Sequence, residues 1–158
     1  MTSTTECDAG RCTMRLKHHR RRRQGNAMQN MPLGAKGSFS LDVTPEHLAN
    51  RFKDAMLPPV LATPVMIMMM ENAALNAMKP YFESGETALG TRVDVRHLAA
   101  TPVGRRVTGE AEVTRVDGRL VEFTIRAMDG AELIGEGTHE RMIINLAKFS
   151  ERLKSKFG

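Results

Sequence analysis

Residues 65–79 constrain the fold of this sequence more than any other segment. They read as a helix that is apolar on nearly every side and holds five of the chain's 12 methionines. Thr63 and Pro64 stand directly before it and are typical of an N-cap and a first helical position. A helix that is hydrophobic all round is usually buried. We therefore expect the rest of the chain to enclose this helix.

Alternation of apolar and polar residues predicts five β-strands. Two Asp-Gly pairs, at 117–118 and 129–130, separate three of the alternating runs, and Asp-Gly is the strongest short-range signal for a β-hairpin. Thr44 and Pro45 open a short helix, and an amphipathic helix ends the chain. The predicted strands are 37–43, 87–98, 106–116, 120–128 and 132–144, and the predicted outer helices are 45–53 and 146–156.

The strand at 87–98 has two different faces. A period of two residues places the charged residues Arg92, Asp94 and Arg96 on one face. The other face then carries Leu89, Val93, Val95 and His97. His97 is therefore expected on the apolar face, close to the end of its strand.

These elements predict an α+β fold. One apolar helix beside a single antiparallel sheet is best buried when the five-stranded sheet wraps around the long central helix, which is the hotdog arrangement. Such a sheet leaves unpaired edges and an open face. Pairing with a second copy is the usual way to cover them, so we expect a homodimer.

The positive charge lies at the start of the chain. The formal net charge is +5, and residues 1–30 hold seven basic against two acidic residues, so the other 128 residues are neutral overall. The opening segment has too few apolar residues to offset the entropy of ordering it. We expect residues 1–34 to be a disordered basic tail and residues 35–158 to be the folded domain. Met28 and Met31 are alternative translation starts, and we favour a tail that is not native.

The sequence argues against several classes of partner. The basic run 18–23 has no interleaved aromatic residues to stack on bases, so nucleic acid is not expected. No apolar run reaches the roughly 20 residues that span a bilayer, so a membrane is not expected. Cys7 and Cys12 both lie in the tail with no matching pair downstream, and we expect neither a metal nor a cofactor. A folded part without cysteine fits a cytoplasmic protein.

Glu71 is the one acidic residue of the central helix. Burying an unpaired carboxylate costs several kcal/mol, so we expect this side chain to have a partner or a function. Either the helix tilts and Glu71 reaches water or a salt bridge, or Glu71 acts in catalysis. We favour the second interpretation because perturbed acids concentrate at active sites.

Thr63 and His97 are the other candidates for chemistry. Thr63 stands about 12 Å along the helix from Glu71 and about 80° around it, so the two cannot touch within one helix. At a helix N-terminus its hydroxyl would suit a polarised carbonyl or the oxyanion formed from it. His97 is either a packed core residue or a base of near-neutral pKa. The three groups together would activate water for acyl transfer.

The last predicted strand carries His139 and Arg141 on one face, with Gly135 and Gly137. The two glycines allow another backbone or a ligand to come close. For Arg141, a cross-strand ion pair and a functional role are both open. For His139, a packed ring and a functional role are both open.

Five short motifs resemble the fluoroacetyl-CoA thioesterase-like family of hotdog proteins, over about residues 38–149. They are Ala62-Thr63-Pro64-Val65-Met66, Met70-Glu71-Asn72-Ala73, Leu89-Gly90-Thr91 with His97, Ala100-Thr101-Pro102, and Gly137-Thr138-His139-Glu140-Arg141. The resemblance implies hydrolysis of an acyl-CoA at a dimer interface. By this resemblance the catalytic residues are Thr63, Glu71 and His97, Gly90 lines the acyl site, and Arg141 lies near the substrate.

The sequence departs from the fluoroacetyl-specific member of that family at two places. That member has glycine after the catalytic threonine and aromatic residues in the lid before it, whereas this chain has Pro64 and the aliphatic Leu57, Val60 and Leu61. These differences argue against a fluorinated substrate.

We therefore expect an acyl-CoA thioesterase that hydrolyses a small or medium acyl-CoA to the free acid and CoA. Within enzymes, the alternative is a hotdog enoyl-CoA hydratase, although the Asp and His pair typical of that branch is not recognisable. From another class, the alternative is a non-catalytic hotdog protein that binds acyl-CoA or another ligand.

Overall fold

The computed structural model describes residues 31–158. The prediction of a disordered tail therefore lies outside the described residues, except at its last four positions. Met31 is buried in the hydrophobic core, and the backbone N–H of Gly34 donates to the carbonyl of Val113. These four residues belong with the folded domain.

The order of elements is the one expected from the sequence. The predicted helix 45–53 is divided at Leu48 into a 3₁₀ turn and a short α-helix, because Leu48 forms a β-bridge with Leu61. The elements are β1 (Lys36–Asp42), η2 (Pro45–His47), α1 (Ala49–Phe52), α2 (Thr63–Met78), η3 (Lys79–Tyr81), β2 (Glu86–His97), β3 (Arg106–Asp117), β4 (Leu120–Asp129), β5 (Glu132–Asn145) and α3 (Leu146–Phe157).

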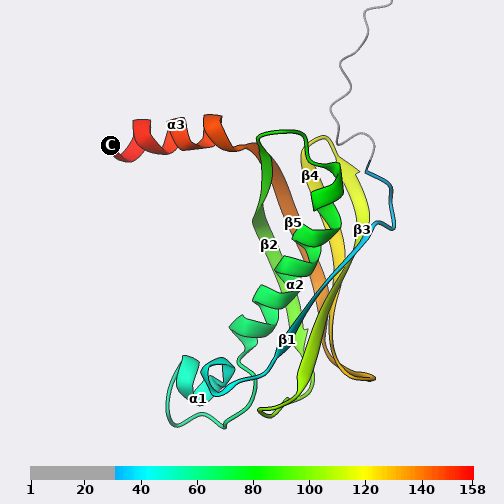
Figure 1. Cartoon of the computed structure of the whole chain (residues 1–158), viewed down its shortest axis with the longest axis vertical. Helices are drawn as coiled ribbons and strands as arrows, with labels where there is room; N and C mark the ends of the chain where they lie inside the picture. The colour runs from blue at the N-terminus through cyan, green and yellow to red at the C-terminus, as the bar shows by residue number, and fades with distance from the viewer. Residues whose placement is uncertain (1–30) are drawn as a thin grey trace, which may run out of the picture.

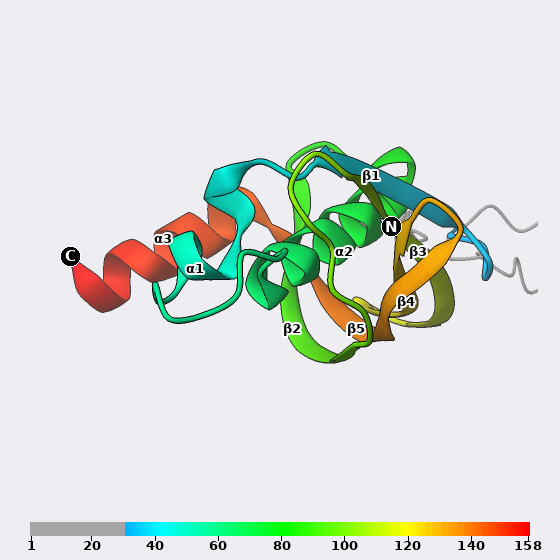
Figure 2. The same ribbon diagram turned by 90° about the horizontal axis from the view of Figure 1, so that it is seen from below.

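The five strands form one antiparallel sheet in the order β1-β3-β4-β5-β2. The two Asp-Gly pairs form the tight hairpins that join β3 to β4 and β4 to β5. Gly118 and Gly130 have φ values of 59° and 61°, a left-handed conformation that glycine adopts without strain. Figure 2 shows the sheet curling around α2 from β1 to β2. The predicted α+β fold, with a five-stranded sheet wrapped around a long helix, is confirmed.

Two glycines let the sheet approach the helix backbone closely. A Cβ atom on Gly37 of β1 would lie 2.3 Å from both the carbonyl oxygen of Ala73 and the amide nitrogen of Ala77. A Cβ atom on Gly109 of β3 would lie 2.8 Å from the carbonyl oxygen of Met69. Because no side chain separates the two layers here, the position of α2 against the sheet is closely fixed.

The helix α2 is less enclosed than its sequence predicts. Its buried residues form pairs at helical spacing on the face toward the sheet: Val65, Met66, Met69, Met70, Ala73, Ala74, Ala77 and Met78. On the opposite side Ile67, Glu71 and Leu75 are half-buried, and Met68 is 37% exposed. Figure 1 shows this side of α2 uncovered by other elements. The expectation of a helix surrounded within one chain is therefore wrong.

A β-bulge changes the faces of β2. The pairing with β5 shifts between Gly90 and Arg92, so Thr91 is not paired with any residue of β5 in the strand register. The expectation that Leu89 shares a face with Val93 and His97 is wrong, because the extra residue reverses the alternation. Gly90 faces α2 instead, and Leu89 is 40% exposed.

Among residues 31–158, no helix is long and apolar enough to cross a membrane. The last helix, α3, has no buried residue and extends away from the sheet, as Figure 1 shows.

Candidate active site

The carboxylate of Glu71 points from the middle of α2 toward β2 and β5. Its side chain is 36% exposed, and its Oε1 lies 3.8 Å from Nε2 of His139 and 4.0 Å from Nη1 of Arg141. A Cβ atom on Gly90 would come within 2.6 Å of the same oxygen. The bulge in β2 thus turns the one residue without a side chain toward the carboxylate. The carboxylate of Glu71 thus has a guanidinium and an imidazole as neighbours, and it is also accessible to solvent.

Arg141 is held in place chiefly by backbone carbonyls. Its Nη2 donates to the carbonyl of Ala88 at 2.8 Å, and its Nη1 donates to the carbonyl of Glu71 at 3.3 Å. The residue is only 7% exposed. Burial lowers the pKa of Arg141, and the charge of Glu71 opposes this effect. The guanidinium is thus a fixed positive group beside the carboxylate.

His139 lies in the same cluster and is completely buried. Its Nδ1 is 2.7 Å from the carbonyl oxygen of Arg92, and its Nε2 is 3.3 Å from Nη1 of Arg141. The ring also lies against Phe123 of β4, with 6.1 Å between the ring centroids.

Thr63 lies at the start of α2, but it does not cap the helix. The N-cap is Ala62, with φ −71° and ψ 135°, and Thr63 is the first helical residue. The predicted N-cap role of Thr63 is therefore wrong. Its hydroxyl is hydrogen-bonded to Nδ1 of His97 at 3.0 Å instead. A hydroxyl paired with an imidazole is an arrangement suited to proton transfer.

The helix N-terminus offers fewer donors than its sequence suggests. Pro64 has no N–H, and the N–H of Val65 already donates to the carbonyl of Ala62. Within the first turn, the groups best placed to meet a developing oxyanion are the N–H and hydroxyl of Thr63.

His97 lies at the end of β2, opposite Gly135 of β5. Burial lowers the pKa of His97, so the ring is neutral at neutral pH. A hydrogen bond with the backbone of Ala99 partly opposes this effect.

The predicted site residues thus form two separate groups within one chain. Glu71, Gly90 and Arg141 lie together at the middle of α2, and Thr63 and His97 lie together at its start. The separation of eight positions between Thr63 and Glu71 corresponds to about 12 Å of helix. The structure therefore brings together the members of each group and leaves the groups apart.

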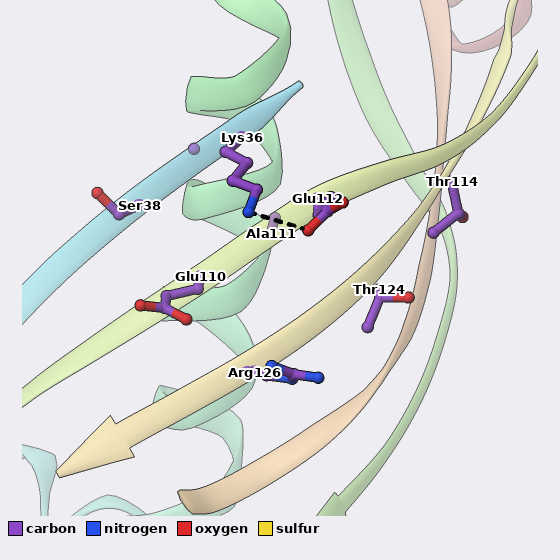
Figure 3. A pocket seen from close by; sticks show the side chains of 9 residues that line it. Lys36, Ser38, Glu110, Ala111, Glu112, Thr114, Thr124 and Arg126 are labelled. Carbon is purple, nitrogen blue, oxygen red and sulfur yellow. Dashed lines mark ion pairs between the residues drawn. The ribbon is translucent and has the colours of Figure 1, made fainter. Parts of the chain in front are cut away.

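A cavity of about 500 Å³ lies on the other side of the sheet (Figure 3). It is an open groove on β1, β3 and β4, lined by charged and hydroxyl side chains, and Lys36 forms an ion pair with Glu112 across it at 3.4 Å. Its lining includes Glu110 and Arg126 but no histidine. The groove is therefore lined by solvated side chains of both charges. We place the candidate active site on the other face of the sheet, toward α2.

The described part of the chain has no group of three or more His, Cys, Asp or Glu side chains placed to hold a metal ion. The residues of the candidate site, a carboxylate, two imidazoles, a hydroxyl and a guanidinium, suit acid–base and acyl-transfer chemistry.

The sequence left the role of His139 open, and the structure places it at the centre of the Glu71 group. The signal available in the sequence was the two-residue spacing of His139 and Arg141 on a strand that also carries glycines. That spacing gives a shared face, but it does not show which helix residue lies opposite.

Comparison with known proteins identifies the family of the chain. Residues 43–147 match the family of fluoroacetyl-CoA-specific thioesterases. The fluoroacetyl-CoA thioesterase of Streptantibioticus cattleyicolor is 47% identical over 102 residues, which are 65% of this chain and 73% of that protein.

Solved structures show the same likeness. A variant of the fluoroacetyl-CoA thioesterase in complex with acetyl-CoA has a TM-score of 0.76 and 38% identity, covering 81% of this chain and all of that one. A hot-dog-like protein from Thermanaerovibrio acidaminovorans has a TM-score of 0.72, covers 81% of this chain and 94% of its own, and at 23% identity supports the hotdog fold alone. Because the family match covers two thirds of its length, the chain belongs to the fluoroacetyl-CoA-specific thioesterase family.

Proposed function

We propose that this protein is an acyl-CoA thioesterase, a hydrolase that cleaves a small or medium acyl-CoA into the free acid and CoA. The observation that carries the proposal is the position of the Glu71 carboxylate. It is half-accessible, it faces a glycine, and it is held beside a guanidinium. Membership of a thioesterase family and the likeness to a thioesterase solved with acetyl-CoA support the substrate class.

The catalytic residues in this proposal are Glu71, His97 and Thr63. Glu71 acts as the general base that takes a proton from water while the water oxygen bonds to the thioester carbonyl carbon, or as the nucleophile that first forms an anhydride. Thr63 donates to the carbonyl oxygen as it becomes an oxyanion. His97 orients that hydroxyl and takes part in proton transfer. The C–S bond breaks when the tetrahedral intermediate collapses, and CoA leaves as a thiolate that takes up a proton. On the nucleophilic route the same collapse leaves the anhydride, which water then hydrolyses to the free acid and the Glu71 carboxylate.

Gly90 and Arg141 are the substrate-binding residues of the proposal. Gly90 leaves room for the acyl group between β2 and the carboxylate, because any side chain there would displace Glu71. Arg141 contributes a positive charge near the reacting carbonyl. We propose that neither a metal nor a cofactor takes part.

The segment before α2 bears on the acyl group. Leu61 is 1% exposed and packs in the core, whereas Leu57 and Val60 are half-buried. These aliphatic side chains offer a lid without aromatic rings, and Pro64 follows the catalytic threonine. We propose that the preferred acyl group is not fluorinated.

A second copy of the chain completes the site in this proposal. The uncovered side of α2 and the unpaired edge strand β2 present Met68, Leu89 and Val93, each between 37% and 40% exposed. A homodimer that covers these residues would bring the Thr63 group of one protomer to the Glu71 group of its partner. A cytoplasmic location is part of the same proposal. Residues 35–158 contain no cysteine, so the folded domain needs no disulfide bond.

Release of CoA from a panel of acyl-CoA thioesters tests the proposal. The panel runs from acetyl-CoA to hexanoyl-CoA and includes fluoroacetyl-CoA. We expect Glu71→Gln and His97→Ala each to lower kcat/KM by about 10²-fold or more, because each removes a group acting on protons in the reaction. Glu110→Gln is the matched control, since Glu110 is an exposed carboxylate on the outer face of the sheet.

Three results would contradict the proposal. Unchanged rates in both site variants would exclude the assigned residues. Binding of acyl-CoA by calorimetry without any turnover would identify a binding protein. Hydration of an enoyl-CoA without CoA release would identify a hydratase.

A further inference from the structure

The imidazole of His139 is buried at the centre of the Glu71 group and has no role in the proposed reaction. It is 0% exposed, and both of its ring nitrogens have partners. A buried histidine with two defined partners has a fixed protonation state, and the chemistry of those partners identifies that state.

The partner of Nδ1 is the carbonyl oxygen of Arg92, 2.7 Å away. A carbonyl oxygen only accepts hydrogen bonds, so Nδ1 carries the proton. Arg92 directly follows the bulge in β2, where the regular pairing with β5 is broken. The bulge that turns Gly90 toward Glu71 thus lies beside the carbonyl that fixes this ring.

The partner of Nε2 is Nη1 of Arg141, 3.3 Å away. A guanidinium only donates, so Nε2 is the acceptor and the ring is neutral. Burial lowers the pKa of His139, which favours the same neutral state, although the Arg92 carbonyl opposes it.

The charged groups around the ring come from two elements. Glu71 faces it from α2, and Arg141 and Glu140 belong to its own strand β5. The side chain of Glu140 is paired with that of Arg92 at 3.3 Å. β4 and β2 place the uncharged Phe123 and Val93 directly opposite His139.

The guanidinium of Arg141 is close to the Glu71 carboxylate without forming a hydrogen bond to it. Nη1 lies 4.0 Å from Oε1, while it donates to the backbone carbonyl of Glu71 and faces Nε2 of His139, both at 3.3 Å. A charge-assisted bond to a carboxylate is stronger than a bond to a neutral acceptor. Two acceptors, the backbone carbonyl of Glu71 and Nε2 of His139, therefore share Nη1 and hold it away from the carboxylate.

We propose that His139 is a positioning residue, whose Nε2 accepts from Arg141 and so keeps the guanidinium off the Glu71 carboxylate. This inference rests on the proposed function, in which that carboxylate takes a proton or attacks the substrate. Without the imidazole acceptor, Nη1 closes from 4.0 Å to hydrogen-bond distance from Oε1. The paired carboxylate is then a weaker base and a weaker nucleophile.

The test compares His139→Leu with His139→Gln. Leucine fills much of the same space without an acceptor, whereas the amide oxygen of glutamine offers one near the position of Nε2. In His139→Leu we expect kcat to fall by about 10- to 100-fold. We also expect a crystal structure of His139→Leu to show Nη1 of Arg141 at hydrogen-bond distance from Oε1 of Glu71, instead of the 4.0 Å of the wild-type chain. His139→Gln should recover most of kcat and of the wild-type separation.

The control is Phe123→Leu, which removes the ring packed against His139 and leaves both hydrogen bonds of His139 in place. This variant should lose stability with no change in the separation of Nη1 of Arg141 and Oε1 of Glu71. Nitrogen NMR of the wild-type imidazole should show a neutral ring protonated at Nδ1 between pH 6.5 and pH 8, the range above the ordinary pKa of a histidine, about 6.5.

An unchanged separation of Nη1 and Oε1 in His139→Leu would overturn the inference, and so would a ring protonated at Nε2. These outcomes differ from a failure of the proposed function, which would appear as full turnover in Glu71→Gln. The crystal structure and the NMR measurement are both obtained without substrate, so they hold whether or not the protein turns over acyl-CoA.

Discussion

The space beside Glu71 depends on the absence of one side chain. A Cβ atom on Gly90 would lie 2.6 Å from the carboxylate oxygen and 3.2 Å from Cε1 of His139. The first of these atoms ends a flexible side chain and can move, while the second belongs to a buried ring. Glycine at this position therefore serves the placement of the carboxylate more than the stability of the fold.

Replacing Gly90 by alanine should therefore impair activity more than folding. The backbone at Gly90 does not have positive φ, so alanine fits the strand, but its methyl group pushes the Glu71 carboxylate away. We expect kcat/KM for the best acyl-CoA to fall by about 10- to 100-fold, with the melting temperature nearly unchanged. Asp94→Ala, an exposed change on the same strand, should leave the rate as it is. Normal turnover in Gly90→Ala would show that the carboxylate is not where the reaction occurs.

At the residue scale, the sequence singled out the candidate residues and missed part of their geometry. Glu71 was recognisable as a lone acid in an apolar helix. The hydrogen bond between Thr63 and His97 joins residues 34 positions apart, so no local pattern could predict it. The pair Thr63 and Pro64 placed the N-cap one residue too late. The same residue types also fit the first turn of a helix, and the observed N-cap is Ala62.

Among the elements, α2 and β1 are joined by an unusually close contact. Gly37 lets the strand lie directly on the helix backbone between Ala73 and Ala77. Here the atoms that a side chain would meet belong to the backbone of α2 and cannot swing away. The contact at Gly37 thus differs in kind from the contact at Gly90.

Gly37→Ala should destabilise the fold. The added methyl group forces β1 and α2 apart, and overpacking of this kind costs about 1–3 kcal/mol. Urea unfolding followed by circular dichroism measures the loss. Ser38→Ala is the matched control, since the neighbouring side chain points to the other face of β1 and should change the free energy of unfolding little. Equal stability of the two variants would contradict the close packing of β1 on α2.

Element types and order followed from hydrophobic periodicity and from the two Asp-Gly turns. The bulge at Thr91 could not be predicted in this way. A bulge adds one unpaired residue to a strand, and the apolar and polar residues on either side of it still alternate. The open side of α2 was also missed. The apolar pattern predicts that residues such as Met68 are buried, but it does not indicate whether the same chain or a second chain buries them.

At the scale of the whole molecule, the two groups of site residues lie apart within one chain and meet only in the proposed dimer. Thr63 and His97 lie at one end of α2, Glu71 lies two turns further on, and the side of the helix between them is uncovered. The same side carries apolar groups that a partner would bury. Our central claim is that the Thr63 group of one protomer and the Glu71 group of the other form one thioesterase site.

Mixing two inactive variants tests this claim most directly. Thr63→Val and Glu71→Gln are each expected to be nearly inactive, and they are unfolded and refolded together to exchange protomers. A mixed dimer contains one site with neither substitution and one with both. Random pairing should therefore restore about one quarter of the wild-type rate of CoA release. If each site were built within one chain, every site in the mixture would carry a substitution, and the absence of any recovered activity would contradict the account.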